Sequence, residues 1–438
     1  MKPIQVGLLG LGTVGGGTLT VLRRNAAEIA RRAGREIRVS MAAVRHLDRV
    51  KDYAHEGMQL TDDPLSLVNH PDIDIVVEAM GGDTPAKELI LAAIAQGKHV
   101  VTANKALIAR HGTEIFAAAQ QHGVIVAFEA AVGGGIPIIK AIREGLTANR
   151  IEWIAGIING TTNFILTQMR DKGSDFADAL ALAQQLGYAE ADPTFDVEGV
   201  DAAHKLTIMS AIAFGIPMQF DRAYIEGITQ LSGDDVRYAE QLGYRIKLLG
   251  ITRRTPTGIE LRVHPALIPE RRLIANVDGA MNAILVKGDA VGVTLYYGAG
   301  AGAEPTASSV IADLVDVARM MTSDPHHRVP HLAFQPDTLS AEPILPMGEV
   351  RTCYYLRMRA VDEAGVLADV TRILADSGIS IEAMVQQEPK GVDGKHVDIV
   401  MLTHQCAEWR INAAIARIEI LPAISSDVMR IRLEHLTG

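Results

Sequence analysis

The stretch IQVGLLGLGTVGGG, residues 4–17, decides the fold of the first third of the chain. An apolar run typical of a buried strand leads into glycines spaced G-x-G-x-x-G, and a helical pattern follows. In this context the first glycine makes a tight turn, the second lets the backbone approach a pyrophosphate, and the third packs the helix closely on the strand. The helix N-terminus then faces the phosphates. The predicted phosphate-binding loop contains Gly10, Gly12, Thr13, Val14 and Gly15.

Short β-type runs alternate with helical patterns as far as Phe128. Such alternation predicts an α/β fold with a parallel, doubly wound sheet of the Rossmann type, covered by helices on both faces. The expected strands are 4–10, 37–44, 72–80, 99–103 and 124–130, and the expected helices are 14–34 and 113–123.

A basic stretch follows the second expected strand. Arg45 stands where an NAD site usually carries an acidic residue for the ribose 2′-hydroxyl, and Arg49 and Lys51 follow it closely. Because a guanidinium suits a 2′-phosphate, the sequence favours NADP over NAD. The alternative is that Arg45 stacks on the adenine or lies in solvent.

The third and fourth expected strands lead into EAMGGD and TANK. Ligands of open α/β sheets bind beyond the carboxyl ends of the strands. We therefore expect Gly81, Thr102 and Lys105 where the nicotinamide and the substrate meet. An isolated lysine at such a place is more often a surface residue, but the TANK context favours a functional one.

The stretch GYAEADPTFDVEGVDAAHKLTIMSAIAFGI, residues 187–216, places five carboxylates and one lysine before an apolar helix. Asp201 and Lys205 are four residues apart and share one helix face. A solvated ion pair is the simple alternative, but Lys205 enters a segment that is apolar nearly all round, which marks a buried helix. A buried lysine needs a carboxylate partner. The cluster therefore predicts a half-buried polar pocket, with Asp196 capping the helix and only Glu198 in solvent.

The bulk composition argues against several classes of function. A net charge of −10 with no basic stripe disfavours nucleic-acid binding. No apolar run reaches the roughly 18 residues of a membrane span, and no signal peptide is recognisable, so no membrane role is expected. Cys353 and Cys406 form no C-x-x-C pair, which favours a cytoplasmic protein without a structural disulfide or zinc site.

The remaining chain divides into three blocks. From residue 351 a β-α-β-β-α-β order appears, which is the ferredoxin-like split βαβ motif. Five prolines between residues 322 and 350 indicate a linker or an extended wrap. The block before them mixes helices, strands and glycine clusters, so we expect an α+β domain for catalysis and dimerisation. The expected division is 1–128, 129–321, 322–350 and 351–438.

Several motifs resemble those of the homoserine dehydrogenase family. They occur in the family's order along the whole chain and include GLGTVG, TANK, EAAVGGGIP, INGTTNFIL, GAGAGAEPTASSVIAD and the spacing of GYAEADPTFDVEGVDAAHK. The C-terminal block, with VDEAGVLADVTRILADSGISI, resembles an ACT domain. The resemblance implies reversible hydride transfer between L-aspartate 4-semialdehyde and L-homoserine with NAD(P), on the route to threonine and methionine.

The resemblance also implies roles for individual residues. Lys205 would donate to the reacting oxygen, where hydride transfer builds negative charge, and Lys105 would lie on its other side. Asp201 and Glu190 would orient the substrate amino group and the lysine, and Asp196 would support the same pocket. The other implied positions are Gly160 and Thr161 around the substrate and Glu304 near the nicotinamide.

A cation and an effector are implied in the same way. A monovalent cation, usually sodium, would bind the Glu129 carboxylate and the carbonyl oxygens of Val132, Gly134 and Ile136, although the segment also suits a hinge. Threonine would be the feedback ligand of the ACT domain, and a homodimer or homotetramer is expected. The regulatory positions implied are Asp362, Gly365, Val366, Leu367 and Ser380, where Ser380 replaces an asparagine common in such domains.

Two other classes of protein compete with this interpretation. A different NAD(P) enzyme on the same plan, such as a phosphorylating semialdehyde dehydrogenase, would need a catalytic cysteine, and the central block has none. A non-catalytic amino-acid sensor would be expected to lose Lys205, Asp201 or the loop glycines, all of which are present.

Overall fold

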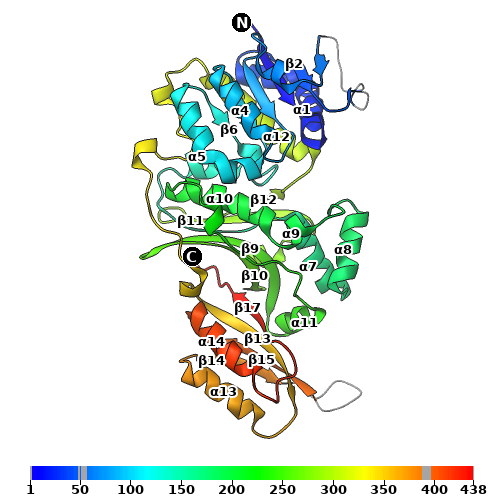
Figure 1. The fold of residues 1–438 in the computed structure, drawn as a ribbon, viewed down its shortest axis with the longest axis vertical. Coiled ribbons are helices and arrows are strands. Elements are labelled where there is room, and N and C mark those ends of the chain that lie inside the picture. Colours follow the sequence, from blue (N-terminus) through cyan, green and yellow to red (C-terminus); the bar gives the residue numbers. More distant parts are fainter. Residues whose placement is uncertain (1, 48–49, 51–56, 387–395, 438) are drawn as a thin grey trace. The chain divides into compact units, whose positions relative to one another are not determined.

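The computed structural model describes residues 2–47, 50, 57–386 and 396–437, which form two compact units. The first unit contains Met1–Gly160, Asp201–Ala223 and Ala280–Glu342. The second contains Thr161–Val200, Tyr224–Gly279 and Pro343–Gly438. Figure 1 shows the elements of both, coloured along the sequence. Within the described residues, no helix combines the length and the apolar character that crossing a membrane requires.

The first unit contains the predicted parallel sheet, whose strands lie in the order β3-β2-β1-β4-β5-β6 with every neighbouring pair parallel. The helices α1 and α12 pack together, as do α4 and α5 (Figure 1). The helix α2 also contacts α1 and α12, and α3 contacts α4. The strands are β1 Ile4–Leu9, β2 Ile37–Ala43, β3 Gln59–Thr61, β4 Ile75–Glu78, β5 His99–Thr102 and β6 Val126–Ala127. The helices are α1 Thr13–Arg24, α2 Ala26–Ala33, α3 Pro64–Val68, α4 Ala86–Ala95, α5 Lys105–Gln121 and α12 Ala303–Met320.

The doubly wound fold is confirmed, but two predicted helices have other bounds. The helix expected over 14–34 is two helices, because the backbone of Asn25 leaves the helical region at φ −110° and ψ 17°. The helix expected over 113–123 begins at Lys105, because the side chain of Asn104 accepts a hydrogen bond from the backbone N–H of Leu107 and caps it (3.1 Å). The strands expected over 72–80 and 124–130 are both shorter.

The first unit also contains three antiparallel strands, β7 Ile151–Ile157, β11 Met281–Gly288 and β12 Gly292–Ala299, with β11 in the middle. The apolar helix α10, Val200–Phe214, is buried along nearly its whole length, as its composition predicts. Close packing of α1 on α12 depends on Gly17, because a Cβ added there would lie 2.5 Å from the carbonyl oxygen of Ala303. The glycine-rich segment before α12 therefore brings the chain back to α1, the helix that follows the first glycine motif.

The second unit is built on a sheet whose strands follow the order β9-β10-β17-β13-β15-β14, with β8 beside β10. Its strands are β8 Tyr224–Ile225, β9 Tyr244–Thr255, β10 Gly258–Pro269, β13 Arg351–Val361, β14 Ile381–Gln386, β15 His396–Thr403, β16 Cys406–Ala407 and β17 Met429–Leu433. Its helices are α7 Gly160–Lys172, α8 Phe176–Gln185, α9 Thr194–Val197, α11 Gly233–Gln241, α13 Val366–Asp376 and α14 Glu408–Glu419.

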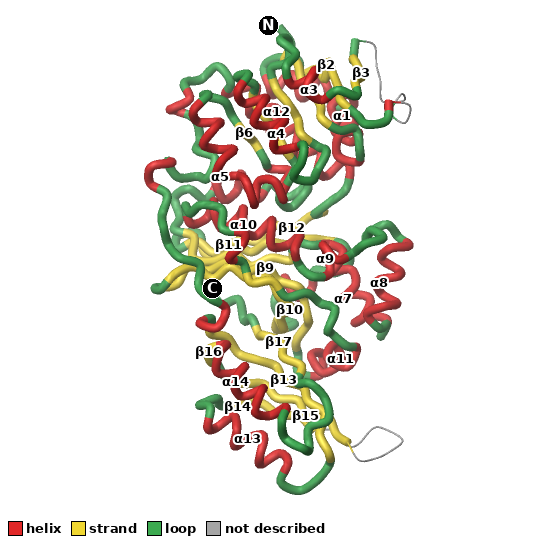
Figure 2. Tube along the Cα trace, viewed as in Figure 1, coloured by secondary structure: helices red, strands yellow, loops and turns green. Residues whose placement is uncertain are grey.

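The predicted β-α-β-β-α-β order is confirmed in β13, α13, β14, β15, α14 and β17 (Figure 2). Its strands lie in the spatial order fourth, first, third, second, which is the ferredoxin-like arrangement. The sheet does not end there, because β17 also pairs in parallel with β10. The proline-rich segment 322–350 contains short 3₁₀ turns, at Pro325–His327, Pro336–Thr338 and Met347–Glu349, and a single parallel bridge from Ile344 to Ile259 of β10. The four-part division of the chain stays a prediction.

Candidate active site

The loop between β1 and α1 has the geometry that the glycine motif requires. Gly10 adopts φ +95°, a conformation that side chains disfavour. A Cβ on Gly15 would lie 2.0 Å from the carbonyl oxygen of Gly10, so the third glycine permits helix–loop contact. A Cβ on Gly12 would meet no protein atom within 4 Å, so the space above it is open to a ligand. No side chain caps α1, which leaves this helix N-terminus suited to phosphates.

The basic stretch after β2 is only partly described. Arg45 is exposed in the segment that follows the strand, which suits contact with the adenosine end of a dinucleotide. Arg49 and Lys51 lie outside the described residues. The role of Arg45 stays a prediction.

A buried carboxylate, which the sequence did not single out, joins the ends of β4 and β5. Glu78 accepts hydrogen bonds from the hydroxyl of Thr102 (2.7 Å) and from the backbone N–H groups of Met80 (2.8 Å) and Gly81 (3.0 Å). The amide of Asn104 donates to the carbonyl of Gly82 (2.6 Å). The predicted positions Gly81 and Thr102 are therefore held together at one edge of the sheet.

The predicted pair of Asp201 and Lys205 forms the centre of a buried polar cluster on α10. Lys205 is 8% exposed, and its Nζ lies 2.6 Å from Oδ2 of Asp201 and 2.8 Å from the carbonyl oxygen of Ile158. The amide of Asn159 donates to the same Oδ2 (2.9 Å), and Nζ of Lys105 lies 3.2 Å from Oδ1. One carboxylate thus organises two lysines that the sequence separates by a hundred residues.

The charge state of Asp201 follows from this geometry. Burial alone would raise the pKa of Asp201, but the ammonium groups of Lys205 and Lys105 and the hydrogen bonds from Lys205 and Asn159 hold it well below its ordinary value. The site therefore contains a fixed negative charge between two positive ones. Such an arrangement is suited to stabilising charge that develops on a nearby oxygen.

A neutral histidine lies next to this pair on α10. Burial, followed by the charge of Arg110, lowers the pKa of His204 to about 4. The imidazole packs on the ring of Phe220 with centroids 4.2 Å apart. The guanidinium of Arg110 lies over the same ring and pairs with Asp83 (3.0 Å), in the loop after β4. The sequence offered no signal for this group, because its members are far apart in the chain.

Several expected substrate residues belong to the second unit. Glu190 is exposed, Asp196 lies within α9, and the hydroxyl of Thr161 donates to the carbonyl of Tyr188 (2.6 Å). In the first unit, a Cβ on Gly160 would lie 2.6 Å from the carbonyl oxygen of Ala280, so this position accepts only glycine. Contact of these residues with Lys205, and the capping role of Asp196, stay predictions.

One expectation about the acidic stretch is wrong. Asp192 is exposed, and it accepts a hydrogen bond from the backbone N–H of Thr194 in a local turn. Glu198, predicted to be the solvated one, is half-buried and accepts a hydrogen bond from the hydroxyl of Thr229 (3.1 Å). The partner comes from a segment thirty residues away, so local sequence could not reveal it.

The predicted cation loop is buried and rich in acid. Glu129 is 1% exposed and accepts backbone N–H bonds from Ile139 and Lys140, both at 2.8 Å. Its own N–H donates to Asp313 (2.8 Å), while Lys140 pairs with Asp316 (2.5 Å) and Asp313 (3.6 Å). Burial and the neighbouring Asp313 raise the pKa of Glu129 to about 7.

Two carboxyl groups, those of Asp313 and Asp316, therefore share the ammonium of Lys140 near the buried Glu129, and an added monovalent cation would balance the excess acid. The donor set of one carboxylate and backbone carbonyls is of the hard oxygen type that such ions favour. Two of the predicted carbonyls already accept hydrogen bonds, that of Gly134 from the hydroxyl of Ser309 (2.6 Å) and that of Ile136 from the N–H of Ile138 (2.8 Å). The chemical type of these donors fits the proposed ion, and the coordination by Glu129, Val132, Gly134 and Ile136 stays a prediction.

Glu304 occupies the first turn of α12, where it is exposed and forms a two-pronged ion pair with Arg24 at 2.9 and 2.8 Å.

In the second unit, Gly365 precedes α13 at φ +104°, directly after the turn that begins with Asp362. The carbonyl of Ser380 accepts a hydrogen bond from the backbone N–H of His404 (2.8 Å). The nicotinamide and effector roles of these positions stay predictions.

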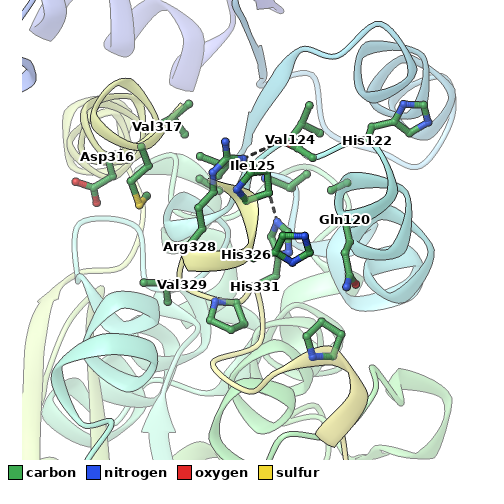
Figure 3. A pocket seen from close by; sticks show the side chains of 18 of the residues that line it. Gln120, His122, Val124, Ile125, Asp316, Val317, His326, Arg328, Val329 and His331 are labelled. Atoms are coloured by element: carbon green, nitrogen blue, oxygen red, sulfur yellow. Dashed lines mark hydrogen bonds between the residues drawn. The ribbon is translucent and has the colours of Figure 1, made fainter. Parts of the chain in front are cut away.

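A cavity of about 490 Å³ lies elsewhere in the first unit, between the end of α5, β6 and the segment that follows α12 (Figure 3). Arg328 donates to the carbonyl of Gly123 (2.8 Å), and His331 accepts from the N–H of Val126 (3.2 Å). The proline-rich segment thus covers the edge strand β6. None of the predicted catalytic residues lines this cavity, so it is separate from the candidate active site.

Comparisons with known proteins match the chain along its length. The family model described as homoserine dehydrogenase matches residues 137–315, its NAD-binding domain matches 10–129, and the ACT domain model matches 354–421. A homoserine dehydrogenase of Pseudomonas aeruginosa is 64% identical over 436 residues and is covered in full, as is this chain. The crystal structure of one from Thiobacillus denitrificans is similar with a TM-score of 0.95 and 73% identity, covering 100% of this chain and 99% of that one. A hyperthermophilic archaeal homoserine dehydrogenase in complex with NADPH is similar over 72% of this chain and 98% of that one, with a TM-score of 0.62 and 25% identity.

Proposed function

The chain belongs to the homoserine dehydrogenase family, and we propose that the Lys205–Asp201 pair at the start of α10 is its catalytic centre. It is an oxidoreductase with a dinucleotide-binding domain and an ACT domain. The reaction is hydride transfer between L-aspartate 4-semialdehyde and L-homoserine. The observation that carries the proposal is a buried lysine held by one carboxylate and one carbonyl.

The ammonium of Lys205 has three N–H donors. Two of them are directed to Asp201 and to the carbonyl of Ile158, which leaves one for a substrate oxygen. When bound, the nicotinamide cofactor supplies the hydride or accepts it. As the aldehyde carbon gains hydride, its oxygen gains negative charge, which Lys205 stabilises and then protonates. Lys105, on the other side of Asp201, stabilises the same oxygen, and Asp201 orients Lys205 and the substrate amino group.

The cofactor is NADP in this proposal. Arg45 is exposed beyond the end of β2, where its guanidinium suits a 2′-phosphate. NADPH, the ligand named for the archaeal relative, is of this class. Sodium or another monovalent cation at the Glu129 loop would neutralise the buried acid beside α12 and stiffen that loop.

Threonine is the proposed effector, bound at the turn between β13 and α13, where Gly365 lets a ligand approach the backbone.

The protein acts as a homodimer or homotetramer. Support comes from β12, an edge strand that exposes Val293, Leu295 and Tyr297 on one side. A row of large apolar side chains on a sheet edge is suited to burial against a second copy.

The test is turnover of aspartate semialdehyde by Lys205→Ala, with Lys87→Ala on α4 as the matched control. Lys87 pairs with Glu114 at a partly exposed site outside the cluster. We expect Lys205→Ala to lose about 10²–10³-fold in kcat, as for removal of one donor to a developing oxyanion, while NADPH still binds. Near-normal turnover of Lys205→Ala would refute the assignment.

A further inference from the structure

A buried network of charged side chains runs through the second unit where the ACT domain meets β10. Arg262 on β10 pairs with Glu434, just past β17, at 2.6 Å. Arg432 on β17 pairs with Glu408 on α14, and both side chains are almost fully buried. Buried charges are stable only when every partner is in place, so this network fixes the position of β17.

Glu226 connects the network to the rest of the second unit. Its Oε2 receives three donors, from Arg432 (2.9 Å), Arg430 (3.2 Å) and the hydroxyl of Tyr224 (2.6 Å). Two of these donors belong to β17, a strand of the ACT domain. Hydrogen bonds between charged groups are stronger than neutral ones, so Glu226 follows the position of β17 closely.

The backbone around Glu226 holds the turn that ends α9. The N–H of Ile228 donates to the carbonyl of Val197 (2.9 Å), and Thr229 donates to Glu198 (3.1 Å). A Cβ on Gly227 would lie 2.5 Å from the carbonyl oxygen of Val197, so the two segments touch backbone to backbone. Contact this close transmits a shift of one segment to the other.

The turn held in this way leads directly into the catalytic helix. Gly199, at φ +83°, ends the turn and packs on Val263 and Ile225. Asp201 follows two residues later in the chain, and Asp196 lies within α9 itself. A shift of Glu226 is therefore passed to the turn between α9 and α10, where the proposed substrate-binding stretch leads into the catalytic helix.

We propose that Glu226 is a positioning residue through which the ACT domain sets the geometry of the homoserine-binding stretch. Movement of β17 changes the hydrogen bonds that Arg430 and Arg432 donate to Glu226. The turn at residues 197–199 then moves together with Glu226. The inference rests on the proposed regulatory role of the ACT domain, and it names the route by which that regulation reaches the substrate.

The test compares Glu226→Gln and Arg430→Gln with the control Arg237→Gln, all in the full-length chain. Arg430 is the milder site because its side chain is 19% exposed, and Arg237 pairs with Asp234 on the exposed face of α11. Hydrogen exchange of residues 194–200 is measured together with kcat and the KM values for homoserine and for the cofactor. Inhibition by threonine, and its binding by calorimetry, are measured on the same samples.

We expect both variants to exchange faster at residues 194–200 and to raise the KM for homoserine about fivefold or more, the lower end of allosteric coupling, with kcat and cofactor KM little changed. Threonine should bind as in the parent but inhibit less. Unchanged exchange, or loss of kcat and all affinities together as in a merely destabilised protein, would overturn the proposal. If threonine neither binds nor inhibits the parent, the effector assignment fails, and exchange and KM still decide the role of Glu226. Should Glu226→Gln not fold, Arg430→Gln decides alone.

Discussion

Replacing Asp201 with asparagine is expected to destabilise the first unit and to disable the site at the same time. The side chain keeps its shape but loses the charge that faces Lys205 at 2.6 Å and Lys105 at 3.2 Å. At an effective dielectric constant of about 20, the shorter contact alone corresponds to about 6 kcal/mol of Coulomb energy. Desolvation offsets part of this, and breaking a buried pair costs about 3–5 kcal/mol in measured cases. Lys105 adds less, because its side chain is 35% exposed and screened by solvent.

Calorimetry should therefore show the transition of Asp201→Asn lowered by roughly 6–12 °C, taking about 3 kcal/mol in a unit of this size. The rate should fall by about 10²-fold or more, because Lys205 loses the partner that aims it. The pH dependence adds a check. Since the pKa of Asp201 is depressed in the folded state, its stabilisation is full above its unfolded value, about 4, and is lost as the pH falls through the folded value. The difference in transition temperature between parent and variant should be constant near neutral pH and should become smaller in acid.

The matched control is Asp192→Asn, the same change at an exposed carboxylate nine residues earlier. It should leave the transition and the rate nearly unaltered, since surface substitutions change stability by at most about 0.5 kcal/mol. If Asp201→Asn behaved like this control in both measurements, the ion pair would be neither structural nor catalytic, and the assignment of the centre would fall.

Three further predictions concern the loops around this centre. Gly12→Ala should fold normally, because no protein atom lies within 4 Å of the new Cβ. Fluorescence titration should show that it binds NADPH at least about tenfold more weakly. Gly15→Ala should instead destabilise the loop itself. The ratio of kcat/KM for NADPH over NADH should exceed one and fall in Arg45→Ala; a strong preference for NADH in the parent would contradict the proposed NADP site. Gly365→Ala should weaken inhibition by threonine without altering uninhibited turnover, because a side chain at φ +104° strains the proposed effector turn. Full inhibition of this variant would place the effector elsewhere.

The sequence predicted those features whose signal is local. The glycine spacing located β1 and α1, and the i, i+4 spacing in an apolar helix located the buried pair of Asp201 and Lys205. Features made by long-range contact were missed, such as Glu78, whose partner Thr102 lies on the neighbouring strand. A cap also moved a boundary, because Asn104 starts α5 eight residues before the helical pattern becomes clear. Neither the glycine motif nor the family resemblance indicated that β17 pairs with β10.

That pairing has a consequence for how the chain is made. Ala266 pairs with Arg432 in parallel, so 166 residues separate the partners (432 − 266). Until the ribosome has released β17, this part of β10 has an unpaired edge, and Arg262 lacks its Glu434 partner. Contacts at such separation form slowly, and open strand edges invite aggregation. The ACT domain is therefore part of the fold of the second unit, because a chain that stops before β17 lacks the strand that joins β10 to β13.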